Sequence, residues 1–589
     1  MSAKQWIARA SIAALVLASM VIGGTPAQAA SQSVTGTIVL ASNGGGVARR
    51  EWNASGGAIN GVNGYVFAVD PATVGTAFTL GLAATNQGVG APSIAFYTDM
   101  TNGITCSTFD GNPGASGVVC GNHAIVYLTA GANTTFTYQS GLAVPPAPAF
   151  VASKFSFSPP IALPFPAGAD QGNIGEPSID VDPANGNIYV TSPTGVPCGA
   201  SNAECVVFWR STDGGNSFVQ PAPGAFLHPI GGGDDDVIHD GLSNVFIDDL
   251  RSLADTGVYR STDQGNTWTS TDTGPCSDRP WLAWGGPNAP TGPATIYETQ
   301  NSGVCTPGAL FQFWRSIDDG LTFLPVGVVN ADLGQLGYSA DATVQGGVEA
   351  KGAIDLVTGD IYIAWATQAI QDGTNATTRI LVISRSTDGG ATWHGHLAYA
   401  GPLGTSIQNL FPVISVDHGG NVFAAYSTQL DGQLMGVYLT KSVDRGATWS
   451  APQRVNPADQ TAVFPAITSG DSGRVDLAWI GTSGTNVSDA TNQWNIFFGQ
   501  SRNAASGSPR WSIGQVSTQV MHLGDICNQG LNCNIFGGNR DLADFISITI
   551  DVDGNANVVW TDDASQSPKA IMFAKQIGGP TTGKLPPKS

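Results

Sequence analysis

The sequence predicts an all-β protein in which a small β-sandwich is followed by a β-propeller. Three observations support this fold class. Gly, Ser, Thr and Asn are abundant and charged residues make up only 12% of the chain, a composition typical of extracellular β-proteins with many turns. An eight-residue pattern recurs five times in the larger part of the chain. Pairs of short apolar strands, joined by turns rich in Asp, Gly and Asn, recur seven times in the same part.

The N-terminus predicts an export signal. Lys4 and Arg9 accompany an apolar run over 10–23, and Ala27-Gln28-Ala29 supplies the small residues of a cleavage site. No later stretch approaches the ~20 apolar residues that span a bilayer. We therefore expect residues 1–30 to be a signal peptide and the mature protein to be secreted, with no membrane span.

The charge balance narrows the classes of partner. Acidic residues outnumber basic ones by 44 to 24, which gives a net charge of −20. Such a charge repels nucleic-acid phosphates and anionic lipid surfaces, so these partners are excluded. A glycan or another extracellular polymer remains as the expected partner, and we expect a monomer.

Residues 31–142 predict the sandwich. Six short strands alternate with Gly- and Asn-rich turns, over 33–40, 64–69, 77–83, 93–98, 123–128 and 135–138. A proline-rich stretch then predicts a stiff linker over 143–153. We assign 154–577 to the propeller and 578–589 to a flexible tail.

The eight-residue pattern reads S-x-D-x-G-x-S/T-W/F, and a basic residue precedes every copy. Its Asp can accept hydrogen bonds from backbone N–H groups in a tight turn, its Gly permits a positive φ, and its aromatic residue can bury a large apolar area between sheets. A sixth stretch, 501–511, keeps the arginine and tryptophan but lacks the aspartate. The five copies begin at Ser211, Ser261, Ser316, Ser386 and Ser442.

This pattern closely resembles the Asp-box, or bacterial neuraminidase, repeat of sialidases and other secreted propellers. The resemblance implies that each copy lies on a hairpin at the rim, away from any ligand. It therefore implies a structural role for the five aspartates, which are Asp213, Asp263, Asp318, Asp388 and Asp444.

Seven inner hairpins predict seven blades, with six as the alternative because the second is short. They cover 177–191, 237–250, 279–298, 352–366, 411–426, 464–480 and 545–561. A strand over 154–158 is expected to close the ring beside the last blade.

Loops that enter the innermost strands surround the mouth of a propeller channel, which is the usual binding face. An arginine and carboxylate rim there suits a polar ligand such as a sugar. The candidates are Glu176, Asp234, Asp235, Asp236, His239, Asp278, Arg279, Trp281, Asp341, Glu349, Asn409, Arg540, Asp541 and Asp544.

Resemblance to sialidases implies three arginines on a substrate carboxylate, a Tyr–Glu nucleophile pair and an acidic proton donor. Arg279 and Arg540 match two of these arginines, whereas a third arginine and a Tyr–Glu pair are not evident. We therefore leave the catalytic residues unassigned. The first functional hypothesis is a glycan-directed protein, either a divergent glycoside hydrolase or a carbohydrate-binding propeller. The alternative is a non-catalytic interaction or scaffold propeller, in which Asp278–Arg279 and Arg540–Asp541 are ion pairs that fix loops.

The cysteines predict disulfides, since the chain is expected to be exported and their number is even. Neighbours in the sequence would pair as Cys106–Cys120, Cys198–Cys205, Cys276–Cys305 and Cys527–Cys533. No zinc spacing is present, and no cofactor is expected. The acidic run 234–236 is typical of a solvated loop, with Ca²⁺ binding as the alternative, and 551–555 is interpreted as a turn.

Overall fold

The computed structural model describes the strands between residues 34 and 140, residues 149–151, and most of the chain from 155 to 583. Within the last range it leaves out 166–170, 172–173, 196–204, 224, 227–232, 252–254, 275–276, 303–310, 341–347, 372–376, 401–410, 430–432, 529–532 and 534–538. The chain divides into two compact units, which meet in the sequence between Pro145 and Pro146. In these ranges no helix is long and apolar enough to cross a membrane.

The first unit consists of two four-stranded antiparallel sheets, as expected for a sandwich. One sheet has the order β1-β8-β4-β6 and the other β2-β3-β7-β5. All six predicted strands are present, whereas the glycine-containing β2 and the short β6 were not predicted. The bounds are β1 (Val34–Val39), β2 (Ala54–Ile59), β3 (Val62–Ala68), β4 (Ala77–Thr85), β5 (Ser93–Thr98), β6 (Ser116–Val118), β7 (His123–Thr129) and β8 (Thr135–Ser140).

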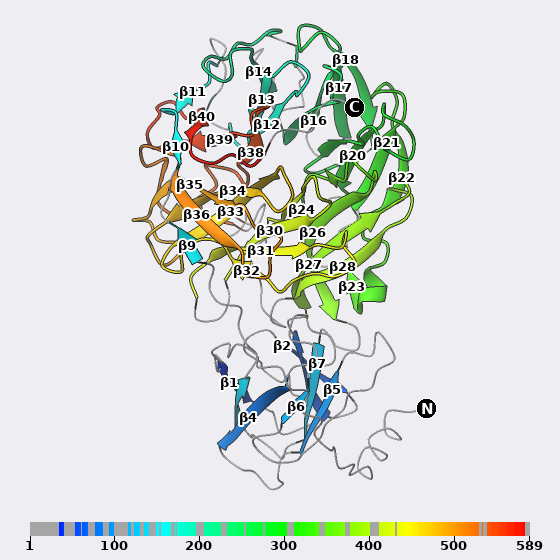
Figure 1. Ribbon diagram of the computed structural model, residues 1–589, viewed down its shortest axis with the longest axis vertical. Coiled ribbons are helices and arrows are strands. Elements are labelled where there is room, and N and C mark those ends of the chain that lie inside the picture. Colours follow the sequence, from blue (N-terminus) through cyan, green and yellow to red (C-terminus); the bar gives the residue numbers. More distant parts are fainter. Residues whose placement is uncertain are drawn as a thin grey trace. The chain divides into compact units, whose positions relative to one another are not determined.

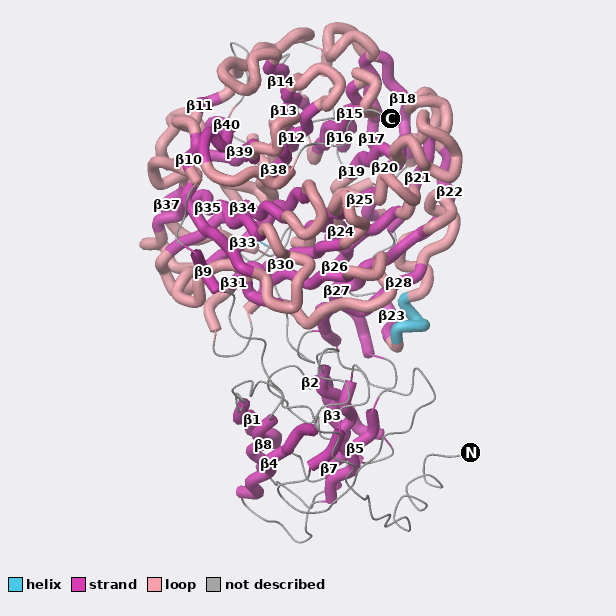
Figure 2. The backbone as a smooth tube through the Cα atoms, in the orientation of Figure 1, coloured by secondary structure: helices cyan, strands magenta, loops and turns pink. Residues whose placement is uncertain are grey.

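The second unit is a seven-bladed β-propeller (Figure 1). Strands and loops make up its described residues apart from a one-turn helix, Leu333–Leu336 (Figure 2). Blade 1 holds β12 (Ser178–Val181), β13 (Ile188–Pro193) and β14 (Val206–Ser211); blade 2 holds β15 (Asp235–His239), β16 (Val245–Arg251), β17 (Asp255–Ser261) and β18 (Thr269–Thr273); blade 3 holds β19 (Trp281–Trp284), β20 (Ile296–Asn301), β21 (Phe311–Ser316) and β22 (Leu324–Val328).

Blades 4 and 6 are larger, because extra short strands pair with them, whereas blade 5 again has four strands. Blade 4 holds β23 (Tyr338–Ala340), β24 (Val348–Glu349), β25 (Ala353–Ile354), β26 (Ile361–Gln371), β27 (Thr377–Ser386) and β28 (His394–Ala400); blade 5 holds β29 (Val413–Val416), β30 (Val422–Thr428), β31 (Gly436–Ser442) and β32 (Gln453–Arg454); blade 6 holds β33 (Thr461–Ser469), β34 (Val475–Thr482), β35 (Gln493–Ser501) and β36 (Arg510–Gln515), joined by β37 (His522–Leu523) and β9 (Ala149–Val151).

Blade 7 closes the ring with strands from both ends of the propeller sequence. Its inner strands β38 (Ser547–Ile550), β39 (Ala556–Asp562) and β40 (Ala570–Gly578) come from the C-terminal end. The N-terminal strands β10 (Ser156–Phe157) and β11 (Ile161–Ala162) pair antiparallel with β40 (Figure 1). The seven predicted inner hairpins, the closure near 154–158 and the seven-blade count are therefore confirmed.

The recurring turns lie between the third and fourth strands of their blades. In the fourth copy, Asp388 Oδ1 accepts hydrogen bonds from Ser386 Oγ at 2.8 Å and the Thr392 backbone N–H at 2.9 Å, and Oδ2 accepts one from Thr392 Oγ1. The other four aspartates make the same set of contacts. In the first copy the hydrogen bonds from Ser217 lower the pKa of Asp213 to about 2. Each carboxylate thus holds its own turn together.

These turns also join neighbouring blades. Gly390 has a φ of +90°, and a Cβ there would lie 2.2 Å from the ring of Phe313 in blade 3. Trp393 packs edge-on against the same ring at 4.9 Å. The basic residue before one copy reaches the next copy: Arg315 Nη1 donates to the Gly389 carbonyl at 2.9 Å. Asn503 replaces the aspartate in blade 6, and its Oδ1 accepts the Arg510 N–H at 2.9 Å.

The disulfide Cys527–Cys533 forms as predicted. Cys205 is also disulfide-bonded, and the other cysteines lie outside the described residues. Residues 580–583, which the sequence analysis assigns to the tail, pack against blades 6 and 7. There Thr582 is fully buried, and its backbone N–H donates to the Gly554 carbonyl at 3.1 Å.

Candidate functional site

Four blades begin with the same unusual backbone step. A non-glycine residue with positive φ stands directly before a proline, ahead of the innermost strand in blades 1, 3 and 5 and within β33 in blade 6. This step is absent from the sequence analysis, although the repeated x-Pro pair before each strand is a visible signal for it. Such φ values are strained for residues with a Cβ and accumulate at functional sites. The residues are Glu176 (φ 48°), Arg279 (φ 42°), Phe411 (φ 43°) and Phe464 (φ 50°).

Two of these residues meet at the mouth of the channel, the end where the innermost strands begin. Arg279 Nη1 lies 2.9 Å from Glu176 Oε2 and 3.9 Å from Asp234 Oδ1. The Arg279 and Glu176 side chains are only 8% and 4% exposed. Glu176 Oε1 also accepts the backbone N–H of Asp544 at 2.9 Å. This buried contact joins the entry loops of blades 1, 2, 3 and 7.

Aromatic rings hold Arg279 in place. Its guanidinium lies 3.7 Å from the ring centroid of Trp281 and 4.4 Å from that of Phe545. Phe545 packs edge-on against Trp281 at 5.4 Å, and Phe411 contacts Phe545 and Phe464 in turn. Cation–π attraction and the loss of side-chain freedom therefore fix the guanidinium. The Trp281 ring is engaged by Arg279 and is not a free platform for a sugar.

Arg540 is the second arginine of the mouth. Its Nε and Nη2 both donate to Asp544 Oδ2, with 3.1 Å for Nε, and Nη2 lies 3.8 Å from Glu176 Oε1. The predicted ion pairs Asp278–Arg279 and Arg540–Asp541 are wrong: the partners are Glu176 and Asp544. Glu176 is 103 positions from Arg279 and Asp544 is four from Arg540, so reasoning from adjacent residues could not find either partner.

Four carboxyl groups of the mouth have raised pKa values, those of Glu176, Asp278, Glu349 and Asp544. Burial and the charge of Asp234 raise the pKa of Asp278 to about 7 and also raise that of Glu176 well above its usual range. Burial, followed by the charge of Asp278, raises the pKa of Glu349. Neither Glu349 carboxylate oxygen has a hydrogen-bond partner among the described residues, whereas its carbonyl accepts from Trp281 Nε1 at 3.0 Å. Asp278 is half-buried, so part of this residue is accessible to solvent.

Blade 2 contributes buried carboxyl groups in β15 as well as Asp234 at the mouth. Asp236 is fully buried and accepts from Ser178 Oγ at 2.6 Å, the Leu282 N–H at 3.0 Å and Lys351 Nζ at 2.9 Å. Asp235 is also fully buried, and burial raises its pKa. His239 Nδ1 contacts Asp180 Oδ2 at 2.6 Å. These three sequence candidates therefore lie in β15 and not in the entry loop.

The other candidates lie elsewhere. Asp541 is exposed, and Asp341 and Asn409 lie outside the described residues. Tyr338 and Tyr426 are buried in blades 4 and 5, and burial raises the pKa of Tyr338 to about 12 and also raises that of Tyr426. Neither tyrosine is therefore prepared to ionise.

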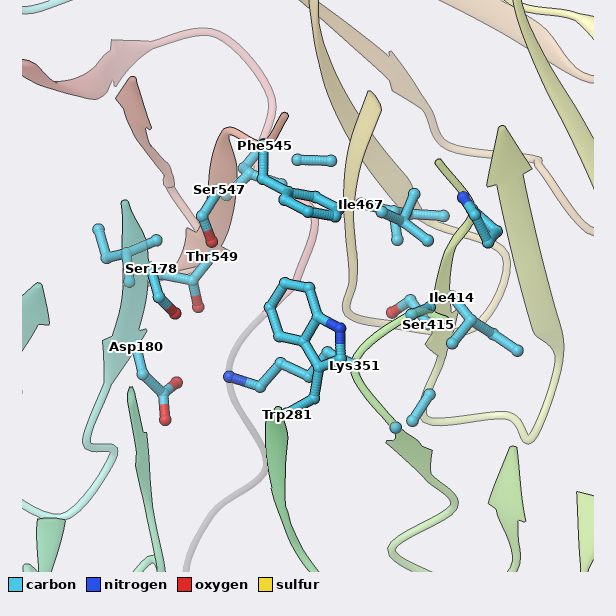
Figure 3. Close-up of a pocket in the computed structure, with 18 of the residues that line it drawn as sticks. Ser178, Asp180, Trp281, Lys351, Ile414, Ser415, Ile467, Phe545, Ser547 and Thr549 are labelled. Atoms are coloured by element: carbon cyan, nitrogen blue, oxygen red, sulfur yellow. The ribbon is translucent and has the colours of Figure 1, made fainter. Parts of the chain in front are cut away.

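The central channel holds a cavity of about 260 Å³ lined by blades 1, 3, 4, 5, 6 and 7 (Figure 3). Figure 3 shows the Lys351 amine directed past Trp281 toward Ser178 and Asp180, with Ile414 and Ile467 on the opposite side. In the described part of the chain no group of three or more His, Cys, Asp and Glu side chains is placed to hold a metal ion. The stretch 551–555 is the β38–β39 turn, in which Asp551 Oδ1 accepts the N–H groups of Asp553 and Asn555.

No protein-family model matches this chain, and no curated protein matches it. Solved structures are similar to this chain at low identity and low TM-score. An α-L-arabinanase of Penicillium chrysogenum complexed with arabinobiose is 15% identical, with 73% of this chain and 98% of that chain covered and a TM-score of 0.35. The α-L-arabinofuranosidase Arb93A of Fusarium graminearum is 12% identical, with 72% of this chain and 97% of that chain covered and a TM-score of 0.37. The NanB sialidase of Streptococcus pneumoniae is 11% identical, with 92% of each chain covered and a TM-score of 0.35. These values carry no conclusion about the chemistry of this chain.

Proposed function

We propose that the protein is a secreted Asp-box propeller that hydrolyses glycosidic bonds at the channel mouth. The observation that supports this most is Asp278, a half-buried carboxyl whose pKa is raised to about 7 beside other carboxyl groups. The export signal and the five Asp-box copies of the sequence are consistent with a secreted protein of this kind.

Glycoside hydrolysis uses two carboxyl groups with different protonation states. One donates a proton to the leaving oxygen, and the other is ionised and acts as nucleophile or base. Asp278 suits the first role, because a carboxyl with a pKa of about 7 still carries a proton near neutral pH. Asp234 suits the second role: its side chain is 23% exposed and lies beside Arg279. Arg279 and Arg540 then serve as positioning residues that fix the loops.

The alternative is a non-catalytic interaction propeller. The observation that favours it is that both mouth arginines are bound by carboxylates of the same protein, as expected for loop-fixing ion pairs. Under this alternative the raised pKa of Asp278 follows from burial alone and has no chemical role.

The test is hydrolysis of a panel of aryl glycosides, sialosides included, by the purified mature protein and two matched variants. Asp278→Asn removes the proposed proton donor while keeping its size, and we expect a loss of turnover of about 10²-fold or more. Asp541→Asn removes an exposed carboxyl from a neighbouring loop and should leave turnover unchanged. Turnover that survives in Asp278→Asn contradicts the assignment, and no turnover of any substrate by the unmodified protein favours the scaffold alternative.

A further inference from the structure

Resting on this proposed function, we infer that the mouth accepts uncharged glycosides and rejects those that carry a carboxylate, sialosides and uronides included. A site for an anionic sugar needs cationic groups that can reach the ligand. The residues of the mouth provide the reverse arrangement.

Arg279 has no surface to offer a ligand. Its side chain is 8% exposed, and its guanidinium is stacked on Trp281 and Phe545. Nη1 already contacts Glu176 at 2.9 Å and lies 3.9 Å from Asp234. A ligand carboxylate would have to displace both the rings and the carboxylates to form a two-point contact.

Arg540 is more open but is also engaged. Two of its three nitrogens, Nε and Nη2, donate to the same oxygen of Asp544, and Nη2 is 3.8 Å from Glu176. Its side chain is 25% exposed. The Nε–Nη2 edge, one of the two edges with which a guanidinium can bind a carboxylate at two points, therefore faces Asp544.

Most other titratable groups that the structure describes at the mouth are carboxyl groups, and the Lys351 amine in the channel is held by Asp236 at 2.9 Å. The described residues of the mouth include two guanidinium groups and five carboxyl groups. Burial raises the pKa values of Glu176, Asp278 and Glu349 most, and repulsion between the carboxyl groups raises them further. The buried Asp235 and Asp236 stand behind them and act on Arg279. A ligand carboxylate would add a further negative charge to carboxyl groups that already repel one another. The five carboxyl groups are Glu176, Asp234, Asp278, Glu349 and Asp544.

A ligand carboxylate would also interfere with the proposed chemistry. Placed near Asp278, it adds a further negative charge to a carboxyl that Asp234 already influences. The added charge holds the proton on Asp278 more tightly, in the same direction as the charge of Asp234. An uncharged sugar causes neither effect and leaves the two carboxyl groups in their different protonation states.

The test uses pairs of p-nitrophenyl glycosides that differ only in a carboxylate, glucoside with glucuronide and galactoside with galacturonide, plus a sialoside. In the pair that the enzyme accepts, kcat/KM should be at least 10-fold higher for the uncharged member at 0.1 M salt. The ratio should narrow at 1 M salt, because the screening length falls from about 10 Å to about 3 Å. Asp234→Asn should reduce the ratio of the two binding affinities of the same pair, measured by calorimetry. The exposed-site variant Asp541→Asn should leave this ratio of affinities unchanged.

The outcomes separate this inference from the function on which it rests. Preference for the glucuronide, galacturonide or sialoside overturns the inference and leaves the hydrolase proposal standing. A ratio that does not respond to salt or to Asp234→Asn also overturns it, because the discrimination would then be one of shape. Failure of every glycoside to bind or react overturns the proposed function itself.

Discussion

Replacing Gly390 by alanine tests how the recurring turns hold the propeller together. The added Cβ would lie 2.2 Å from the Phe313 ring of the preceding blade, well inside van der Waals contact. Phe313 is buried and packed against Trp393, so it cannot move aside without opening the interface between the blades. Gly390 also has a φ of +90°, which an L side chain rarely adopts.

The two effects add. Forcing an extra carbon into a packed core costs about 1–3 kcal/mol, and a left-handed backbone at a non-glycine residue costs about 1–2 kcal/mol. The expected loss in the free energy of unfolding is therefore about 3 kcal/mol, measured by urea denaturation at constant slope. Gly292→Ala is the matched control, because Gly292 has a φ of +103° with nothing within 4 Å of its Cβ. Equal losses in the two variants would refute the packing argument, and a loss below about 1 kcal/mol at Gly390 would refute the whole account.

Three further predictions concern stability. Asp388→Ala removes the acceptor for Ser386 and Thr392 and should cost about 1–2 kcal/mol in urea denaturation; an unchanged midpoint would contradict the role given to the turn. Asp236→Asn places an amide donor against the Leu282 N–H or Lys351 and should lower the free energy of unfolding by about 3 kcal/mol. A loss of less than about 1 kcal/mol would contradict this prediction. Burial raises the pKa of Asp476 to about 7, so the folded protein retains a proton there that the unfolded chain releases above about pH 4. This stabilisation is complete below pH 4 and is lost as the pH rises through 7. The free energy of unfolding, measured by urea denaturation, should therefore fall from pH 5 to pH 8. Asp476→Asn should remove on the order of 3 kcal/mol of that fall. An identical pH dependence in the variant would contradict the role given to Asp476.

The propeller could be predicted because its signals repeat. One S-x-D-x-G-x-S/T-W/F segment is weak, but five copies in register with seven inner hairpins specify both the fold and the blade number. The extra strands β2 and β6 were missed because one contains two glycines and the other spans three residues, so neither gives an alternating apolar pattern.

The composition of the mouth was predicted, whereas its pairing was not. Entry-loop position alone identified Glu176, Arg279 and Arg540, because the start of each innermost strand lies at the same end of the channel. The sequence could not assign partners, since Glu176 and Arg279 are separated by 103 positions and meet only when the ring closes. The x-Pro step that directs Glu176 and Arg279 toward each other was readable but was not used.

The central claim, that Asp278 donates a proton to a departing glycosidic oxygen, is tested most directly by the leaving-group dependence of hydrolysis. The measurement compares kcat/KM of the unmodified protein and of Asp278→Asn over a series of aryl glycosides that share one sugar and differ in leaving-group acidity. A good leaving group departs without protonation, so the account predicts a small loss for the most acidic phenols and a loss that grows steeply for the least acidic ones. A uniform loss across the series, or no loss, would contradict the proton-donor role of Asp278.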